Sequence, residues 1–598
     1  MSSFLSPEVR INEIDLTGFT QATRGGLPGY TVSPFQWGPA EKPILVSDTT
    51  FERYFGPPNA SIVQEWHSAR NFLFYSGRLY VSRMISSTAK NAVALAEKTV
   101  EVQEPVLDGE GNPVLDGEGN PAFTTVTQTI PTEGILIENI EKFETITEGV
   151  SSLPVTETGH FVARYPGAFG NGLIVSVADA STFDDWEYSF YFDSKPGTSE
   201  YAQERGGVND EMHIIIVDGS GNFTGTPGTI LERYAFVSKA VDTRAEGQNT
   251  YYIQAVNNAS AYVYCLAPFE GYGVEAAEVA FPDLPEYKVT LAGGTDNFAE
   301  LGDLDYMRNF AHYLTAEDIN GVIMFTGISS KTVFQYCLDK VVERRKDCVV
   351  VHTPPFSLTR GQRQADAIMD YTVSPTGINR SSSYGILSDN WKMIFDRYTG
   401  KTIWLPTNSD VAGCIARVGN TREPWFSPGG VEAGKIVNCM RLAWNPDKND
   451  RDTLYKNGIN SIINIRGQGP VLFGDRTMLR KASAFRQIHV RILFIYLRMD
   501  LGEVAAKMLF RLNDAITRAN FRNLTEPYLR DIQGRRGLSE YRVVCDETNN
   551  PPEVRVRQEF VGTVMVKPIN SINFVTLNLV GVREGMEFDE IENLNVET

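Results

Sequence analysis

The sequence has few histidines and cysteines, and it has no long apolar run. Six residues of each of these two types occur among 598 residues. No H-E-x-x-H zinc motif, C-x-x-C pair or G-x-S-x-G nucleophile elbow is present, and no apolar stretch approaches the ~18 residues of a membrane span. These absences argue against a metalloenzyme, a dithiol oxidoreductase, a serine hydrolase and a membrane-inserted protein, so we expect no enzyme activity and no cofactor or metal.

A secretion signal and a disulfide framework are also missing. Met1–Ile14 has neither the basic segment nor the apolar segment of a signal peptide. A chain of this length needs no disulfides to stabilise its core. We therefore expect the cysteines to be free, buried thiols in a reducing cytoplasm.

Basic residues are outnumbered by acidic ones. The sequence has 55 Lys and Arg against 74 Asp and Glu, a net charge of −19, which argues against nucleic-acid binding because that requires a basic face. The charge is uneven: residues 480–542 hold 13 basic and 6 acidic side chains, whereas residues 583–598 hold one basic and 6 acidic. A chain with a basic late segment and an acidic tail can attract copies of itself.

Two stretches partly match a phosphate-binding loop, and both fail. Thr399–Thr402 has Phe395 where the motif requires an upstream glycine, and Gly429–Lys435 is followed by Ile436 where Ser or Thr must hold Mg²⁺. We expect no nucleotide site.

The hydrophobic pattern predicts α/β structure in two separated segments, residues 21–98 and 295–482. The continuously apolar strands are typical of a buried parallel sheet. The expected strands are 30–35, 44–46, 79–83, 322–325 and 348–352, and the expected helices are 61–75 and 331–345.

The segment between these pieces predicts a β-rich insertion. Residues 99–160 contain a duplicated octapeptide, Val106–Pro113 and Val114–Pro121, whose Asp-Gly and Asn-Pro pairs indicate turns. A calcium site there lacks the ligand spacing and final Glu of an EF-hand. Residues 161–294 predict strands at 173–177, 214–217, 251–255 and 287–291.

Residues 483–585 begin with helices, predicted at 490–513 and from about 514, where Pro527 is expected to interrupt the helix and Thr525 to cap a new one. Strands are expected at 541–545, 554–556, 560–566 and 573–582.

Three arginines in this region share one helix face if the helix is continuous: Arg511, Arg518 and Arg522, at i, i+7 and i+11. Two interpretations stay open. The arginines form a solvated face with local ion pairs, or they dock onto an acidic protein surface. Nucleic acid is disfavoured because no aromatic residues are interleaved with them.

Both chain ends resemble strands that lack a partner. Glu8–Ile14 alternates polar and apolar residues, with Val9 and Ile11 on one side, and the acidic tail carries Phe588 and Ile591 as isolated apolar residues. Because a lone short strand is unstable, each end must pair with something.

Several ordered motifs resemble the tail sheath proteins of contractile-tailed phages, especially the T-even type. They cover about 60% of the chain, but not the duplicated octapeptide. The main ones are Pro7–Ile14, Phe35–Pro39, Tyr165–Asn171, Asn390–Lys392, Asn420–Trp425, Leu442–Pro446, Leu454–Asn460, Gly467–Gly469, Leu472–Asp475, Phe521–Asn523, Asp531–Gly537 and Val544–Asn550.

The resemblance implies a discontinuous α/β and α+β multidomain fold, in which both termini meet in one inner domain. The expected parts are an N-terminal arm (1–20), the first piece of a middle α/β domain (21–98), a turn-rich outer inserted domain (99–160), a β-rich protruding domain (161–294), the second piece of the middle domain (295–482), an inner tube-facing assembly domain (483–585) and a C-terminal arm (586–598).

The resemblance also implies a function: stacked hexameric rings around a tail tube that contract to drive the tube through the host envelope. The expected partners are identical subunits, the tube protein, and baseplate and tail-terminator proteins, in a virion assembled in the host cytoplasm. Val9, Ile11, Ile14, Phe588 and Ile591 are expected in the inter-subunit strands, and Arg511, Arg518 and Arg522 are the tube-facing candidates. The alternatives are a virion-associated hydrolase and a non-contractile tube or shell protein.

Overall fold

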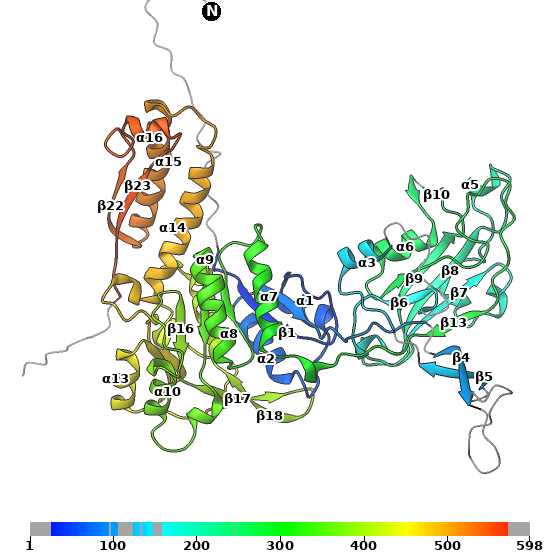
Figure 1. Ribbon diagram of the computed structural model, residues 1–598, viewed down its shortest axis with the longest axis horizontal. Coiled ribbons are helices and arrows are strands. Elements are labelled where there is room, and N and C mark those ends of the chain that lie inside the picture. Colours follow the sequence, from blue (N-terminus) through cyan, green and yellow to red (C-terminus); the bar gives the residue numbers. More distant parts are fainter. Residues whose placement is uncertain are drawn as a thin grey trace, which may run out of the picture. The chain divides into compact units, whose positions relative to one another are not determined.

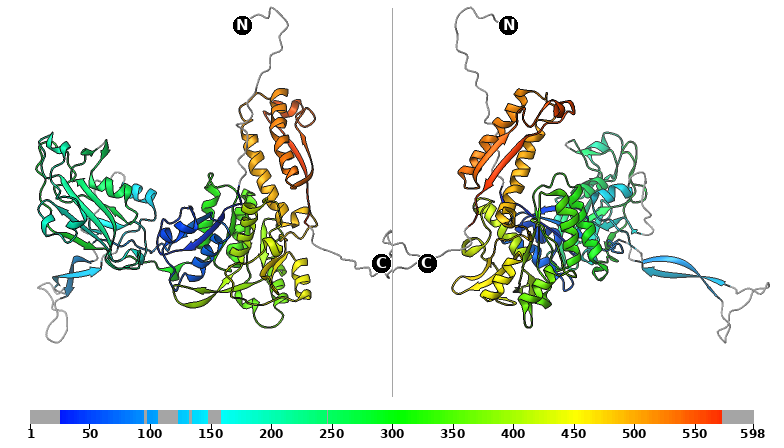
Figure 2. Two further views of the ribbon diagram at one scale, coloured as in Figure 1. Left: turned by 180° about the vertical axis from the view of Figure 1, so that it is seen from behind. Right: turned by 60° about the vertical axis from the view of Figure 1, so that its left-hand side comes forward.

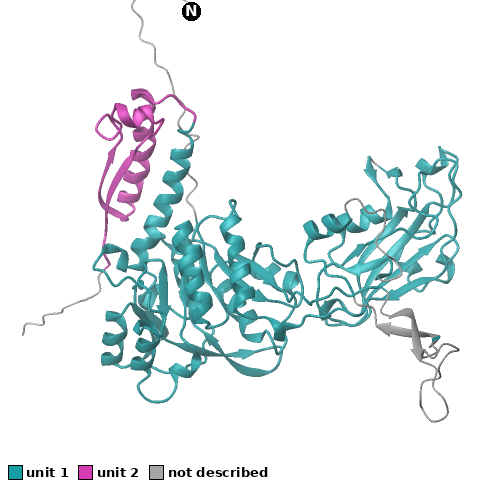
Figure 3. Ribbon diagram, in the orientation of Figure 1, with its two compact units in different colours: residues 1–509 teal, residues 510–598 magenta. Residues whose placement is uncertain are grey.

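A computed structural model describes residues 25–94, 97–105, 123–131, 134–147, 158–245 and 247–571. The chain divides into two compact units, Met1–Leu509 and Phe510–Thr598 (Figure 3). Both predicted arms, the duplicated octapeptide and the predicted strand 573–582 lie outside the described residues. The division after residue 509 differs from the predicted start of an inner domain at 483, so the predicted domain boundaries stay a proposal.

The first unit is built on an eight-stranded sheet with the order β2-β3-β1-β14-β15-β16-β20-β21 (Figures 1 and 2). The strands from β3 to β20 in that order run parallel, and β2 and β21 are antiparallel edge strands. The bounds are β1 Gly29–Pro34, β2 Ile44–Val46, β3 Leu79–Met84, β14 Ile323–Phe325, β15 Val349–His352, β16 Gly385–Ser388, β20 Ile459–Ile465 and β21 Gly469–Phe473. Two segments far apart in the sequence therefore form one sheet.

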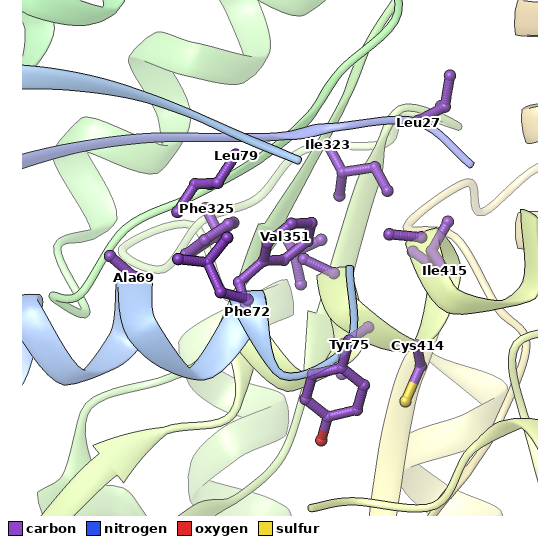
Figure 4. Packing of buried hydrophobic residues seen from close by; sticks show 14 of the residues in the cluster. Leu27, Ala69, Phe72, Tyr75, Leu79, Ile323, Phe325, Val351, Cys414 and Ile415 are labelled. Atoms are coloured by element: carbon purple, nitrogen blue, oxygen red, sulfur yellow. The ribbon is translucent and has the colours of Figure 1, made fainter. Parts of the chain in front are cut away.

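Both faces of this sheet are buried. Ile323 and Phe325 face a core with helices α1, α2, α11 and α14, whereas Met324 faces a second core with α7, α8 and α10. In Figure 4, side chains of α2 and α11 meet those of the strands on the first face. Alternate residues of each strand point to opposite faces, so a strand with helices on both sides buries both rows of its side chains, and most of these are apolar.

The helices of the first unit agree with the predicted ones in the α/β segments. The predicted helix 331–345 is present, with a π-helical stretch at Cys337–Val342 between α8 and α9. The bounds are α1 Asp48–Phe55, α2 Val63–Leu73, α7 Asp303–Thr315, α8 Lys331–Tyr336, α9 Glu343–Arg345, α10 Gln364–Val373, α11 Asn408–Thr421, α12 Gly430–Ala433, α13 Lys448–Lys456 and α14 Ile488–Ala506. A smaller antiparallel sheet joins β17 Trp391–Asp396, β18 Lys401–Pro406 and β19 Arg441–Leu442.

The inserted segment contains an antiparallel sheet with the order β13-β7-β8-β9. Its predicted strands at 173–177, 214–217 and 287–291 are confirmed. The bounds are β4 Glu97–Pro105, β5 Phe123–Pro131, β6 Phe161–Ala163, β7 Leu173–Asp179, β8 Glu211–Asp218, β9 Thr229–Ser238, β10 Arg244–Ala245, β11 Gln248–Asn249, β12 Val263–Cys265, β13 Tyr287–Thr290, α3 Ile140–Thr147, α5 Glu200–Gln203 and α6 Tyr252–Ala259. β4 and β5, which flank the octapeptides, pair antiparallel.

The strand predicted at 251–255 is wrong, because this segment forms helix α6. Tyr252 and Val256 are both fully buried on that helix. They stand four residues apart and share one helix face, which packs into the core of the insertion. Five residues were too few to separate this helical spacing from strand alternation.

Arg83, at the end of β3, ties the insertion to the parallel sheet. Its side chain is 1% exposed, and its guanidinium donates to the carbonyl oxygens of Phe35 (2.7 Å), Gly38 (2.7 Å) and Pro166 (2.7 Å). Burial lowers the pKa of Arg83 to about 10, so the group stays charged at neutral pH. Next to it, Gly167 has φ +128, and an added Cβ would lie 2.4 Å from an Asp296 oxygen.

Lys392 is the centre of a second buried polar cluster in the first unit. Its ammonium donates to Asp410 Oδ1 (2.8 Å), Asn71 Oδ1 (2.6 Å) and the Val437 carbonyl (2.8 Å). The Tyr75 hydroxyl donates to the same Asp410 oxygen at 2.6 Å. The side chains of Lys392 and Asp410 are 0% exposed, so the ion pair connects β17, α2 and α11 without contact with water.

The second unit contains helix α15 Ala515–Gly534, strands β22 Leu538–Val544 and β23 Thr563–Pro568, and the short helix α16 Pro552–Val556. Four predictions for residues 483–585 are wrong. The first predicted helix, α14 of the first unit, ends at Ala506 and not at 513. Pro527 lies inside α15 and does not interrupt it, Thr525 caps no new helix, and residues 554–556 are helical.

We predict that Lys392→Met lowers the stability of the first unit by about 3–5 kcal/mol, because it leaves a buried carboxylate unpaired. The control is Lys195→Met, which removes an exposed ion pair with Asp184 and should cost under about 1 kcal/mol. Denaturant unfolding monitored by tryptophan fluorescence measures both. Equal effects of the two substitutions would contradict the role given to Lys392.

Candidate functional site

The edges of the two-stranded sheet in the second unit are the candidate functional site. β22 and β23 pair antiparallel from Leu538↔Pro568 to Val544↔Thr563, with one irregularity between Leu538 and Glu540. Within the described residues, neither strand has a second strand partner. Each strand therefore has one edge without a strand partner among these residues, where backbone groups can pair with another chain. Side chains already donate to the carbonyls of Ser539, Val544 and Lys567.

One face of this sheet packs against helix α15. The helix buries Phe521, Leu529 and Ile532. In β22, Leu538 is buried and Tyr541 and Val543 are half-buried. The Phe521 and Phe560 rings pack edge to face with centroids 5.5 Å apart. A rigid helix therefore supports the sheet from behind and leaves its edges open.

The opposite face of the sheet is exposed and polar. Glu540 and Lys567 form an ion pair across the strands, and the neighbouring cross-strand pair is Arg542 with Met565, both exposed. Because charged side chains on this face discourage stacking of a second sheet, the strand edges are the better surface for a partner strand.

A side-chain network fixes the loop that joins β22 to α16. Asn550 is 0% exposed, and its amide donates to the Val561 carbonyl and accepts from the Val561 N–H, both at 2.8 Å. Asp546 Oδ1 accepts the Thr548 N–H at 2.9 Å, and Asn549 Nδ2 donates to the Val544 carbonyl at 2.7 Å. The motif Val544–Asn550 thus holds the loop next to the start of β23.

The structure does not place the three predicted tube-facing arginines on one helix. Arg511 is exposed in the connection between α14 and α15, so the premise of a continuous helix is wrong. Arg518 is 4% exposed and donates to Asn513 Oδ1 at 3.2 Å. Arg522 is half-buried and lowers the pKa of Asp546, after the larger contributions of the Thr548 hydroxyl and N–H. Only Arg511 and Arg522 keep surface available to a partner.

The predicted strand residues of the two arms, Val9, Ile11, Ile14, Phe588 and Ile591, lie outside the described residues. Their role stays a prediction.

Two buried histidines of the first unit have structural partners. His67 Nε2 lies 2.9 Å from Asp396, and His352 Nε2 lies 3.0 Å from the Tyr371 hydroxyl. Burial lowers the pKa of His352 to about 3, so its ring is neutral at physiological pH. In the part of the chain that the structure describes, no group of three or more His, Cys, Asp or Glu residues is placed to hold a metal.

Three further structural features bear on the sequence analysis. Gly429–Lys435 contains the four-residue helix α12, and Lys435 pairs its backbone with Val471, so this segment belongs to the sheet edge. All six cysteines are free, and all except Cys439 are buried. No helix among the described residues is long and apolar enough to cross a membrane.

Two family models match the chain. The phage tail sheath protein central domain matches residues 299–478, and the phage tail sheath C-terminal domain matches residues 480–580. A tail sheath protein of Vibrio phage KVP40 is 29% identical, and the match covers 98% of this chain and 100% of that protein. The chain belongs to the phage tail sheath family.

Other similarities extend over nearly the whole chain. The tail sheath protein of Enterobacteria phage T4 is 27% identical over 99% of this chain and 100% of that protein. A sheath tail protein from Listeria innocua has a similar fold, with a TM-score of 0.54, 12% identity and coverage of 93% of this chain and 94% of that one. The T-even type resemblance found in the sequence is therefore confirmed.

The motifs that carry the family resemblance mainly organise backbone. Asn390 Nδ2 donates to the Trp444 and Ile462 carbonyls, and Trp391 Nε1 donates to the Pro354 carbonyl. Asn460 bridges two backbone segments in the same way. These residues of the sheath family hold strands and loops in place, a structural role.

We predict that Asn550→Ala destabilises the second unit by about 1–3 kcal/mol, because it leaves the Val561 N–H and carbonyl without partners. Asn523→Ala, at an exposed position of α15, is the matched control and should change stability little. Hydrogen exchange of the β23 amides measures the effect. Unchanged protection in Asn550→Ala would show that the loop is held by other contacts.

Proposed function

We propose that this chain is the structural subunit of a contractile phage tail sheath, which polymerises as stacked hexameric rings around the tail tube. Contraction of the polymer drives the tube through the host envelope. The observation that carries this proposal is the family relationship over nearly the entire chain. The alternatives, a virion-associated hydrolase and a non-contractile shell protein, have no such support.

In the proposed assembly, the chain ends of neighbouring copies pair with the open edges of β22 and β23. Val9, Ile11 and Ile14 belong to the donated N-terminal strand, and Phe588 and Ile591 to the C-terminal one. One observation and one general rule support this. Among the described residues, the sheet contains only the two strands β22 and β23. A two-stranded sheet by itself is only marginally stable. A strand added to each edge satisfies its backbone groups.

The strength of such a joint follows from its hydrogen bonds. Each backbone bond contributes roughly 0.5–1.5 kcal/mol net, so a short strand contributes a few kcal/mol. The joint repeats at every subunit. Because an arm is a tether and the folded units are rigid bodies, the joint survives rotation of one subunit against the next.

The energy for contraction is stored at assembly, as the difference between an extended polymer and a more stable contracted one. No nucleotide, metal or catalytic group takes part, so the subunit is not an enzyme.

Its further partners are the tube, baseplate and tail-terminator proteins. The sheath assembles in the host cytoplasm and acts as part of the virion, and the domain division given above describes its inner, middle and outer parts.

Arg511 and Arg522 make the reversible contact with the tube. Both lie in the second unit and retain exposed surface, and positive charge suits an acidic partner surface whose attraction weakens with salt. Arg518, also predicted to face the tube, acts by positioning Asn513 at the start of α15.

Deletion of residues 1–16 tests the arm proposal. The truncated chain should remain a soluble, folded monomer with an unchanged thermal transition, because the two compact units are retained. It should fail to form tubules in negative-stain images under conditions where the full chain polymerises. Normal polymerisation of the truncated chain refutes the role of the N-terminal arm.

Charge reversal tests the tube contact. Arg511→Glu with Arg522→Glu should reduce co-sedimentation with preformed tail tubes at low salt and leave the fold intact. Arg244→Glu, an exposed arginine of the insertion, is the matched control and should bind tubes normally. Equal binding by the double variant and the wild type would remove these arginines from the interface.

A further inference from the structure

A cleft in the first unit has a volume of ≈ 870 Å³, within the roughly 300–1,000 Å³ range of small-molecule sites. Its walls come from several separate parts of the chain. The end of α1 supplies Arg53, and the loop between β8 and β9 supplies Asn222 and Phe223. This cleft has no part in the assembly function proposed above.

The floor of the cleft is aromatic and rigid. The Phe223 ring packs edge to face against Phe169 (centroids 4.7 Å apart), Tyr262 (5.0 Å) and Trp37 (5.0 Å). Trp37 is buried behind it, whereas Phe223 and Tyr262 are half-buried and line the cleft. The rings therefore form a fixed apolar surface that needs no rearrangement to accept a flat apolar face.

The glycine-rich loop over this floor cannot hold a phosphate. Asp218 Oδ2 accepts the N–H groups of Phe223 (2.9 Å) and Thr224 (2.8 Å), and the Gly225 N–H donates to the Gly221 carbonyl at 2.9 Å. These amides are committed within the loop, so they provide neither an anion-binding nest nor donors for a peptide backbone.

Several side-chain groups at the cleft are not used by the fold. Among the described residues, neither the Arg53 guanidinium nor the Tyr262 hydroxyl makes an ion pair or hydrogen bond. The Asn222 amide donates to the Phe169 carbonyl at 3.1 Å, which leaves its oxygen as an acceptor. Glu52 is already paired with Arg397 at 2.7 Å, so among the described residues Arg53 has no ion pair with it.

We propose that this cleft binds a hexose unit of an oligosaccharide. A pyranose ring has an apolar C–H face that fits against the Phe223 and Tyr262 rings. Its hydroxyls can accept from Arg53 and Tyr262 and donate to the Asn222 oxygen. Arg53 accommodates both a neutral hexose and a hexuronate, whose carboxylate it would pair.

The test uses the full-length chain on an array of immobilised neutral hexose and hexuronate oligosaccharides, followed by calorimetric titration with the hexasaccharide that binds best. We expect binding by the wild type. Arg53→Gln and Tyr262→Ala should each weaken it about tenfold, the loss expected for one to two hydrogen bonds. Tyr262→Phe should retain more affinity than Tyr262→Ala because it keeps the ring.

Two matched variants control for the position of the site. Arg78→Gln removes an exposed arginine outside the cleft, and Phe190→Ala removes an aromatic ring that is 75% exposed elsewhere in the insertion. Both should bind like the wild type. The proposal is overturned if no saccharide on the array binds, if Arg53→Gln and Tyr262→Ala bind unchanged, or if inorganic phosphate displaces the sugar.

Discussion

The parallel pairing of β1 with β14 sets the organisation of the first unit. It aligns Gly29 with Ile323 and Thr31 with Phe325, so two segments separated by nearly 300 residues must share one sheet. Most of the chain between β3 and α7 is then an insertion that leaves the sheet, and α7 returns to cover one face of it. Arg83, at the end of β3, binds carbonyls on both sides of that junction.

The second unit depends on a different constraint, the unpaired edges of a small sheet. Its hydrophobic core is sufficient to hold α15 against β22, but the strands β22 and β23 have no further strand within the described residues. An open edge is a hazard for a solitary protein and an advantage for a subunit that polymerises. The described fold and the proposed assembly thus place the joint on a rigid helix-backed support.

Much of the fold could be predicted from sequence, for physical reasons that differ between elements. The apolar strands of the parallel sheet are unambiguous because both faces are buried. The sequence predicts a helix break at Pro527, but α15 continues through it. A proline removes the hydrogen bond to the carbonyl four residues earlier, here that of Asn523. Pro527 and Asn523 both lie on the exposed side of α15, where water can satisfy this carbonyl. Residues 554–556 are β-branched in part, but Pro551 and Pro552 favour a helix start. The cleft at Arg53 could not be predicted, because its residues come from distant segments with no shared motif.

The most direct test of the account is a cryo-EM reconstruction of tubules assembled from the full-length chain. The account predicts that β22 and β23 lie inside a larger sheet, with one added strand from residues 1–16 of a neighbouring copy and one from residues 586–598 of another. A map in which both ends fold back onto their own subunit, or in which the edges of β22 and β23 remain bare, would contradict it.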